Sequence, residues 1–176
     1  TGPNYTDASD WIRYSTIDGL PHNKSRTVEM DSSGVIWVGT YNGLATFNGT
    51  GFTDVAIPST TFGPRINDIR TGLDGEMWFA SSNGVAKFDG TNWEFFYQSD
   101  GLIHDFTYRL EIAPDSTIWI ASRGGVTIIT DTGLVSLDKA DGLIHEHCRC
   151  IEQDSDGNMW VGTWHGVSVI EEVIDT

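Results

Sequence analysis

Three histidines at matching places in the chain are the first residues whose type and spacing indicate chemistry. His22, His104 and His145 lie 82 and 41 residues apart, and the last two occupy the related segments DGLIHD and DGLIHE. Neutral imidazole is a common zinc ligand, so three such rings on one face are candidate ligands of a divalent metal, with Asp105 or Glu146 orienting them. The simpler interpretation is that each histidine closes its turn and faces solvent. We therefore predict no metal and no other cofactor. The alternative is a metal site whose candidate ligands are these three histidines.

A second group of polar and aromatic residues also recurs at matching places. Tyr41, Arg123 and Trp164 each follow a segment of the form Trp-x-Gly/Ala-Thr/Ser, and Asn42 and His165 come directly after two of them. Rings that stack, together with side chains that form directional hydrogen bonds, are what a polar ligand requires, a sugar in particular. The predicted ligand-binding residues are therefore His22, Tyr41, Asn42, His104, Arg123, His145, Trp164 and His165.

These residues recur because one unit is repeated four times along the chain. Its tryptophans, Trp37, Trp78, Trp119 and Trp160, follow one another at steps of 41 residues with no insertion or deletion. An equal period of about 40 to 45 residues, with short strand-like runs and glycine turns, is typical of β-propeller blades. The predicted fold class is therefore all-β: a β-propeller in which four 41-residue repeats form four four-stranded blades.

The first strand-like run of each unit indicates what lines the centre of the propeller. These runs share an apolar position, which Val28 occupies in the first unit and Ile151 in the last, and they alternate as strands do. Two residues before this position stand Arg26, Tyr108 and Arg149 in three of the units. We predict that these three side chains line the central channel, where Arg26 and Arg149 together suit an anionic ligand.

The two ends of the repeat array predict how the ring closes. Residues 10–16, DWIRYST, resemble the fourth strand-like runs of the units, whereas the last unit stops after a third-type strand at Ile170. The opening run is therefore predicted to complete the last blade and close a four-bladed ring. Two alternatives remain open: two chains that join into an eight-bladed ring, or a piece of a larger propeller. The predicted propeller domain spans residues 9–171, with tails at 1–8 and 172–176.

The charge of the chain excludes some classes of partner. The formal net charge is −15 and the isoelectric point is near 4.4, so the chain as a whole repels phosphate backbones and anionic lipid surfaces. No run approaches the ~18 apolar residues that a membrane-spanning helix needs. We therefore predict no nucleic-acid partner and no membrane contact by this domain.

The order of motifs within the unit resembles that of a known repeat. The segments DGLPHN, DSSGVIWVGT and GLATFNG follow one another in the first unit, and together they resemble the two-component regulator propeller repeat. The second unit departs from the pattern at Thr60–Phe62, where Asp-Gly-Leu is replaced, and the third has Ser116 in place of the turn glycine. The resemblance implies a non-catalytic periplasmic or extracellular sensor that binds a small polar ligand such as a glycan fragment. It also implies further propeller or kinase domains in the full-length protein.

Two other classes of function are weighed against the sensor. The sequence contains no nucleophile elbow, phosphate loop or paired catalytic carboxylates at a recognisable spacing. Streptogramin-inactivating lyases have similar Asp-Gly-x-x-Trp turns on seven blades, and that resemblance implies His104, His145 and Glu146 as base and metal ligands. The third class is a structural or protein-interaction propeller, in which the eight-bladed homodimer would be one form.

Overall fold

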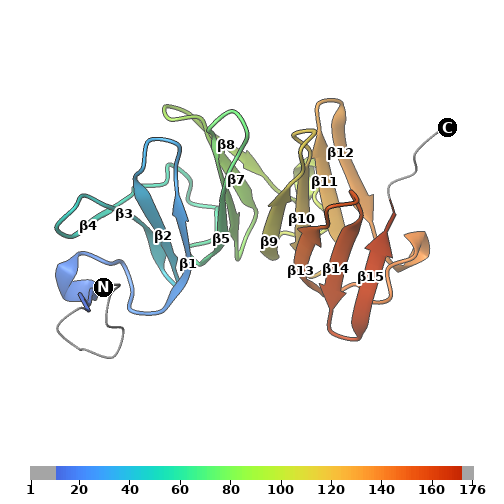
Figure 1. Cartoon of the computed structure of the whole chain (residues 1–176), viewed down its shortest axis with the longest axis horizontal. Coiled ribbons are helices and arrows are strands. Elements are labelled where there is room, and N and C mark those ends of the chain that lie inside the picture. Colours follow the sequence, from blue (N-terminus) through green and yellow to red (C-terminus); the bar gives the residue numbers. More distant parts are fainter. Residues whose placement is uncertain (1–10, 172–176) are drawn as a thin grey trace, which may run out of the picture.

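The computed structural model describes residues 11–171, which fold into four antiparallel β-sheets arranged side by side (Figure 1). The predicted tails at residues 1–8 and 172–176, and the first residues of the predicted domain, lie outside the described residues. The sheets confirm the all-β class and the propeller-like blades. Within residues 11–171 the helical segments are single 3-10 turns, and none is long and apolar enough to cross a membrane.

Each repeat forms one sheet, here called a blade, with its strands in sequence order. Blade 1 consists of β1 (Ser25–Met30), β2 (Ile36–Thr40), β3 (Gly43–Phe47) and β4 (Phe52–Asp54). Blade 2 consists of β5 (Ile66–Thr71), β6 (Met77–Ser81), β7 (Val85–Phe88) and β8 (Trp93–Phe96). Blade 3 consists of β9 (Thr107–Ile112), β10 (Ile118–Ser122), β11 (Val126–Thr130) and β12 (Gly133–Leu137). Blade 4 has three described strands, β13 (Cys148–Gln153), β14 (Met159–Thr163) and β15 (Gly166–Ile170).

Three 3-10 turns lie outside the sheets, at η2 (Thr16–Asp18), η3 (Gln98–Asp100) and η4 (Lys139–Asp141). Each ends at a glycine in the left-handed conformation and leads toward the next first strand, because these are the Asp-Gly turns of the repeat. The first strands β1, β5, β9 and β13 lie next to one another in that order. They therefore form the inner edge of the array, as predicted for the start of each unit.

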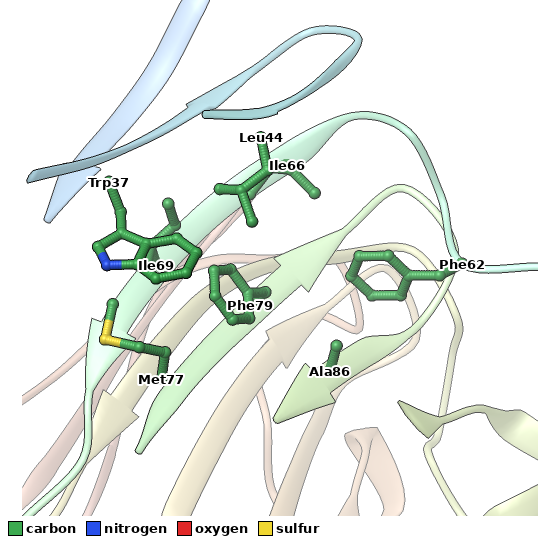
Figure 2. Packing of buried hydrophobic residues seen from close by; sticks show 8 residues of the cluster. All are labelled: Trp37, Leu44, Phe62, Ile66, Ile69, Met77, Phe79 and Ala86. Carbon is green, nitrogen blue, oxygen red and sulfur yellow. The ribbon is translucent and has the colours of Figure 1, made fainter. Parts of the chain in front are cut away.

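Neighbouring blades are held together by the repeated tryptophan. Trp37 of blade 1 is 7% exposed, and its ring lies 5.7 Å from that of Phe79 and 6.1 Å from that of Phe88, both in blade 2. Leu44 of the same blade is buried beside it, against Ile66 and other apolar residues of blade 2 (Figure 2). Burial of this kind stabilises a blade pair by a few kcal/mol for each large side chain. Trp37 therefore serves packing between blades 1 and 2.

A buried carboxylate joins three blades. Asp68 in β5 is fully buried and accepts a hydrogen bond of 3.3 Å from the hydroxyl of Thr27 in blade 1. From blade 3 it accepts a hydrogen bond of 3.0 Å from the backbone N–H of Leu110 and one of 3.0 Å from the guanidinium of Arg109. A buried charge is tolerated when it is paired and hydrogen-bonded in this way. Asp68 thus fixes how blades 1, 2 and 3 are placed relative to one another.

Aspartates stabilise the tight turns before the first and last tryptophan strands. Asp31 accepts hydrogen bonds from Ser33, from the backbone of Val35 and from the indole N–H of Trp37. Asp154 makes the equivalent bonds to its own turn and accepts one of 2.7 Å from the indole N–H of Trp160. These carboxylates cap their own turns.

These bonds predict a local pH response at the last turn. The hydrogen bond from the Trp160 indole, followed by that from Asn158, lowers the pKa of Asp154 from 3.8 to about 2. Because the folded pKa is depressed, the contribution to stability is present above pH 3.8 and is lost as the pH falls toward 2. We expect the NMR resonance of the Trp160 indole N–H to shift with a midpoint near pH 2. Asp154→Asn is expected to abolish this transition, and its persistence in that variant would assign it to another group.

The predicted ring closure differs from the structure. Residues 11–15 form no strand, and the ring of Tyr14 packs 5.2 Å from Phe47 and 5.4 Å from Phe52, both in blade 1. Blade 1 and blade 4 lie at opposite ends of the array (Figure 1), and β15 has no fourth strand beside it among the described residues. The prediction that the opening run completes the last blade of the same chain is therefore wrong. The reason is that apolar rings of blade 1, which come next in sequence, already cover Tyr14.

Candidate functional site

The residues predicted to bind ligand gather at one end of the strands. The first residue of each inner strand pairs with the last residue of its second strand, as Ser25 does with Thr40 and Thr107 with Ser122. The loops that enter the inner strands therefore lie beside the connections between second and third strands. We call the surface formed by these two sets of loops the entry face.

A chain of cations stacked on aromatic rings crosses the first half of the entry face. The guanidinium carbon of Arg65 lies 4.8 Å from the centre of the Tyr41 ring and 4.8 Å from that of Phe106, so Arg65 bridges blades 1 and 3. The guanidinium carbon of Arg123 lies 5.5 Å from the centre of the same Phe106 ring, and Nζ of Lys24 lies 5.5 Å from the centre of the Tyr41 ring. Each such contact contributes about 0.5–1 kcal/mol at an exposed position. The contacts hold the cations in place while leaving hydrogen-bond donors available.

The same arrangement continues over blades 3 and 4. The Phe106 ring lies 4.9 Å from that of Tyr108, which carries Arg149 at 4.1 Å. The Tyr108 hydroxyl lies 2.6 Å from Nε2 of His147, and the His147 ring stacks on Trp164 at 3.9 Å. We call the whole set the cation–aromatic strip; it consists of Lys24, Tyr41, Arg65, Phe106, Tyr108, Arg123, His147, Arg149 and Trp164.

The charges of the strip are not neutralised by neighbouring carboxylates. Among residues 11–171, the ion pairs are those of Arg70 and Arg109 with Asp68, so none involves an arginine of the strip. The Nε atom of Arg65 is buried and has no hydrogen-bond partner within that same range. A chain with a net charge of −15 therefore concentrates unpaired positive charge on one face. Such a face attracts an anionic group despite the net charge.

The protonation of the strip follows from its crowding. Partial burial, then the nearby charges of Arg65 and Arg149, lower the pKa of Arg26, which places Arg26 close to the strip. Burial, then the charges of Arg123 and Arg149, lower the pKa of His147, so this imidazole is neutral at pH 7. At neutral pH the positive charge of the strip is therefore carried by its arginines and by Lys24.

The histidines considered as metal ligands close their own loops. Nδ1 of His22 accepts a hydrogen bond of 2.8 Å from the backbone N–H of Lys24, and His104 and His145 make the same contact two residues further along at 2.8 and 2.9 Å. Within residues 11–171 no three His, Cys, Asp or Glu side chains are grouped so that they could hold a metal ion. The structure thus assigns these rings a role in turn geometry.

The predicted site residues are only partly brought together. Tyr41, Arg123, Trp164, Tyr108 and Arg149 are members of the cation–aromatic strip. His22 lies at its edge, with its ring 5.8 Å from Tyr41, whereas His145 and His165 stack on each other at 4.5 Å. The side chain of Asn42 is exposed at the loop of blade 1, next in sequence to Tyr41.

Four members of the strip, Lys24, Arg65, Phe106 and His147, were not predicted from the sequence. They belong to one repeat position, since Lys24, Arg65, Phe106 and His147 follow one another at steps of 41 residues. A cation or ring at every copy of this position was the available signal. It was overlooked because the position precedes the inner strand rather than lying within it.

Grooves elsewhere on the molecule are separate from this site. One of about 510 Å³, between blades 1 and 2, is lined by residues including Asp31, Trp37 and Asp74. Asp31 and Asp74 belong to the tight turns at the ends of the strands opposite the entry face. A second groove, of about 560 Å³, lies at the entry face, and its lining includes Asn42, Gly43 and Pro64 but no residue of the cation–aromatic strip.

Comparison with known proteins identifies the repeat. A family model described as two component regulator propeller matches residues 19–42 and 142–165, the same part of the first and last units. Two of the four units match the two-component regulator propeller repeat. The matched segments contain His22, Tyr41, Arg149 and Trp164, so the entry face of these propeller repeats includes both ends of the strip.

Solved structures share the arrangement of these propeller repeats. The extracellular domain of a putative hybrid two component system from B. thetaiotaomicron is 19% identical, with a TM-score of 0.82 over 92% of this chain and 23% of that one. The extracellular domain of a putative one component system from the same organism is 20% identical, with a TM-score of 0.73 over 86% of this chain and 22% of that one. This chain therefore spans less than a quarter of the length of each of these two extracellular domains. No protein with a curated description matches the sequence.

The lyase resemblance is also visible at the level of the fold. Virginiamycin B lyase from Staphylococcus aureus, solved with quinupristin, is 16% identical, with a TM-score of 0.64 over 86% of this chain and 57% of that one. This TM-score is lower than those of the two sensor domains. At such identities the likeness concerns the architecture of the propeller repeats alone.

Proposed function

We propose that this chain is a non-catalytic sensor module that binds a small acidic saccharide on the cation–aromatic strip, outside the cytoplasm. The family of the repeat supports a sensor propeller, and the extracellular neighbours support the location. The observation that carries the proposal is the strip itself, where arginines without carboxylate partners alternate with aromatic rings across three blade boundaries.

The chemistry of the strip selects the class of ligand. The rings of Tyr41 and Trp164 are exposed, so the apolar face of a sugar ring can stack on them. Arg65 and Arg149 present guanidinium groups that bind carboxylate or sulfate with two parallel hydrogen bonds. A short oligosaccharide of uronic acids combines both features, which a neutral sugar does not.

We expect an oligogalacturonate to bind the chain in isothermal titration calorimetry, and its neutral counterpart to bind much more weakly. Arg65→Ala removes a cation that contacts two rings and is expected to weaken binding at least about tenfold, or ~1.4 kcal/mol. Lys139→Ala, which removes one positive charge at the exposed turn η4, is the matched control and should leave the affinity unchanged. Equal losses in both variants would reduce the effect to net charge and contradict a defined site.

The lyase alternative has a distinct outcome in the same experiment. It relies on His104, His145 and Glu146, and the Nδ1 atoms of both histidines already accept backbone hydrogen bonds. Binding that depends on an added divalent metal and is lost in His104→Ala would support a lyase or metal sensor. Binding without metal supports the proposed saccharide sensor.

A further inference from the structure

The surface that each blade presents to the preceding blade is exposed at the start of the array. Val28 of β1 is 61% exposed, whereas the residues at the same repeat position, Ile69, Leu110 and Ile151, are 0%, 0% and 3% exposed. These three are buried because a preceding blade covers them. Blade 1 thus carries the receiving half of the inter-blade interface without an occupant among residues 11–171.

The other half of the same interface is exposed at the end of the array. Val167 of β15 is 56% exposed, although Leu44, Val85 and Val126 at the same position are completely buried. Trp160 is 46% exposed, compared with 4% for Trp78. Blade 1 and blade 4 therefore present the two complementary halves of an interface that the chain itself forms three times.

The pairing of the outer strands predicts what would fit beside β15. In blade 2, Val85 pairs with Phe96, and in blade 3, Val126 pairs with Leu137. If residues 11–14 paired with β15 in the same register, Tyr14 would lie opposite Val167 and Ile12 opposite Val169. Ile12 is 77% exposed and Val169 is 41% exposed. Because these segments lie at opposite ends of one molecule (Figure 1), they can meet only between two molecules.

Polar contacts repeat across the boundaries in the same way. Glu29 of blade 1 accepts a hydrogen bond of 3.2 Å from the backbone N–H of Thr71 in blade 2. At the corresponding place, the backbone of Gln153 in blade 4 lies near enough to Glu111 of blade 3 to favour the charged form of its carboxylate. At a boundary between blade 4 and a following blade 1, the equivalent hydrogen bond would run from the backbone N–H of Met30 to Glu152. Glu152 is exposed, and Met30 is 58% exposed. The exposed ends are therefore matched in polar as well as apolar groups.

We infer that blade 4 binds blade 1 of a second copy of this chain, head to tail. Residues 11–14 of the second copy add a fourth strand to β15, and Trp160 and Val167 pack against its Val28. The contact continues the inter-blade interface already present in the chain, and it satisfies the open edge of β15 by strand addition. Such an interface is heterologous, so each molecule uses one end to bind and the other to be bound.

Sedimentation velocity at physiological and higher salt tests this association, because salt screens the repulsion between copies that each carry a charge of −15. We expect the average mass of the chain to rise with concentration. Val28→Glu and Val167→Glu each place a charge on one exposed half, and each variant alone is expected to be monomeric. Both substituted positions are exposed, so circular dichroism and the melting temperature should show an intact fold.

Mixing the two variants distinguishes head-to-tail binding from other contacts. The Val28→Glu chain retains its blade 4 surface, and the Val167→Glu chain retains its blade 1 surface. An equimolar mixture is therefore expected to form one-to-one dimers and nothing larger. Association of either variant with itself would indicate a symmetric contact and overturn the inference.

A thiol crosslink tests the register of the added strand. Ile12→Cys and Val169→Cys chains, both carrying Cys150→Ser to remove the exposed native thiol, should be joined by a short thiol crosslinker when mixed. Arg13→Cys is the control, since a shift of one residue turns its side chain to the other side of the sheet. Equal crosslinking of both would contradict the register. A wild-type chain that stays monomeric at every concentration would overturn the inference and assign the surface to further blades of a longer polypeptide.

Discussion

Trp78→Ala is expected to destabilise the domain by about 3–5 kcal/mol, the usual range for removing a buried aromatic side chain. Trp78 is 4% exposed and packs in the cluster that joins blades 2 and 3, with Leu110, Ile118 and Ile120 around it. Its ring also stacks on Phe96 at 5.8 Å. Because typical domains have a stability of 5–15 kcal/mol, this variant is expected to be largely unfolded or to melt far below the wild type in urea and thermal denaturation.

Trp160→Ala is the matched control because it is the same residue at the same repeat position. With 46% of its surface exposed, it should lose less than about half as much stability as Trp78→Ala. Equal losses would show that the tryptophan stabilises its own blade rather than the boundary with the next one. That result would contradict the inter-blade role assigned to the residue.

Asp68→Ala is expected to cost about 3 kcal/mol, because hydrogen bonds to a charged group contribute about 1.5–3 kcal/mol and the buried N–H of Leu110 would lose its partner. The guanidinium of Arg109 would lose its carboxylate as well, although it keeps 43% of its side chain exposed to water. Asp131→Ala, at an exposed loop position, should change the free energy of unfolding by no more than about 0.5 kcal/mol. Chemical denaturation of the two variants measures the difference.

A small effect of Asp68→Ala would have a definite meaning. It would show that the apolar contacts between the blades alone fix their arrangement, and that the carboxylate network is dispensable. Asp68 also accepts a hydrogen bond from the hydroxyl of Thr27. In that case, Thr27→Val in the Asp68→Ala background would cause no further loss of stability.

The repeat period predicted the strands because every copy solves the same packing problem. Val28, Ile69, Leu110 and Ile151 fall on inner strands as expected, since an apolar position at a constant step takes the same place in the sheet of each blade. Ring closure was not predictable in this way. The run at residues 11–15 has the composition of an outer strand, but composition does not say which blade it joins, and the rings of Phe47 and Phe52 decided this by covering Tyr14.

The candidate site was predictable where it depends on a single loop. Tyr41, Arg123 and Trp164 each come directly after the tryptophan strand of their unit, so their place could be predicted from the sequence. The structure places all three in the cation–aromatic strip. Arg65 acquires its place through rings in the two neighbouring blades. Contacts that cross a blade boundary depend on the angle between blades, and one unit read alone contains no information about that angle.

The exposed ends of the array have a consequence for how the molecule unfolds. In a solenoid-like row each unit is stabilised by its immediate neighbours, so the two outer units have one stabilising boundary and the two middle units have two. Loss of structure should therefore begin by fraying from either end, while the strands around Asp68 keep the slowest amide exchange. A partner that covers the exposed sides of blades 1 and 4 should therefore sharpen the melting transition.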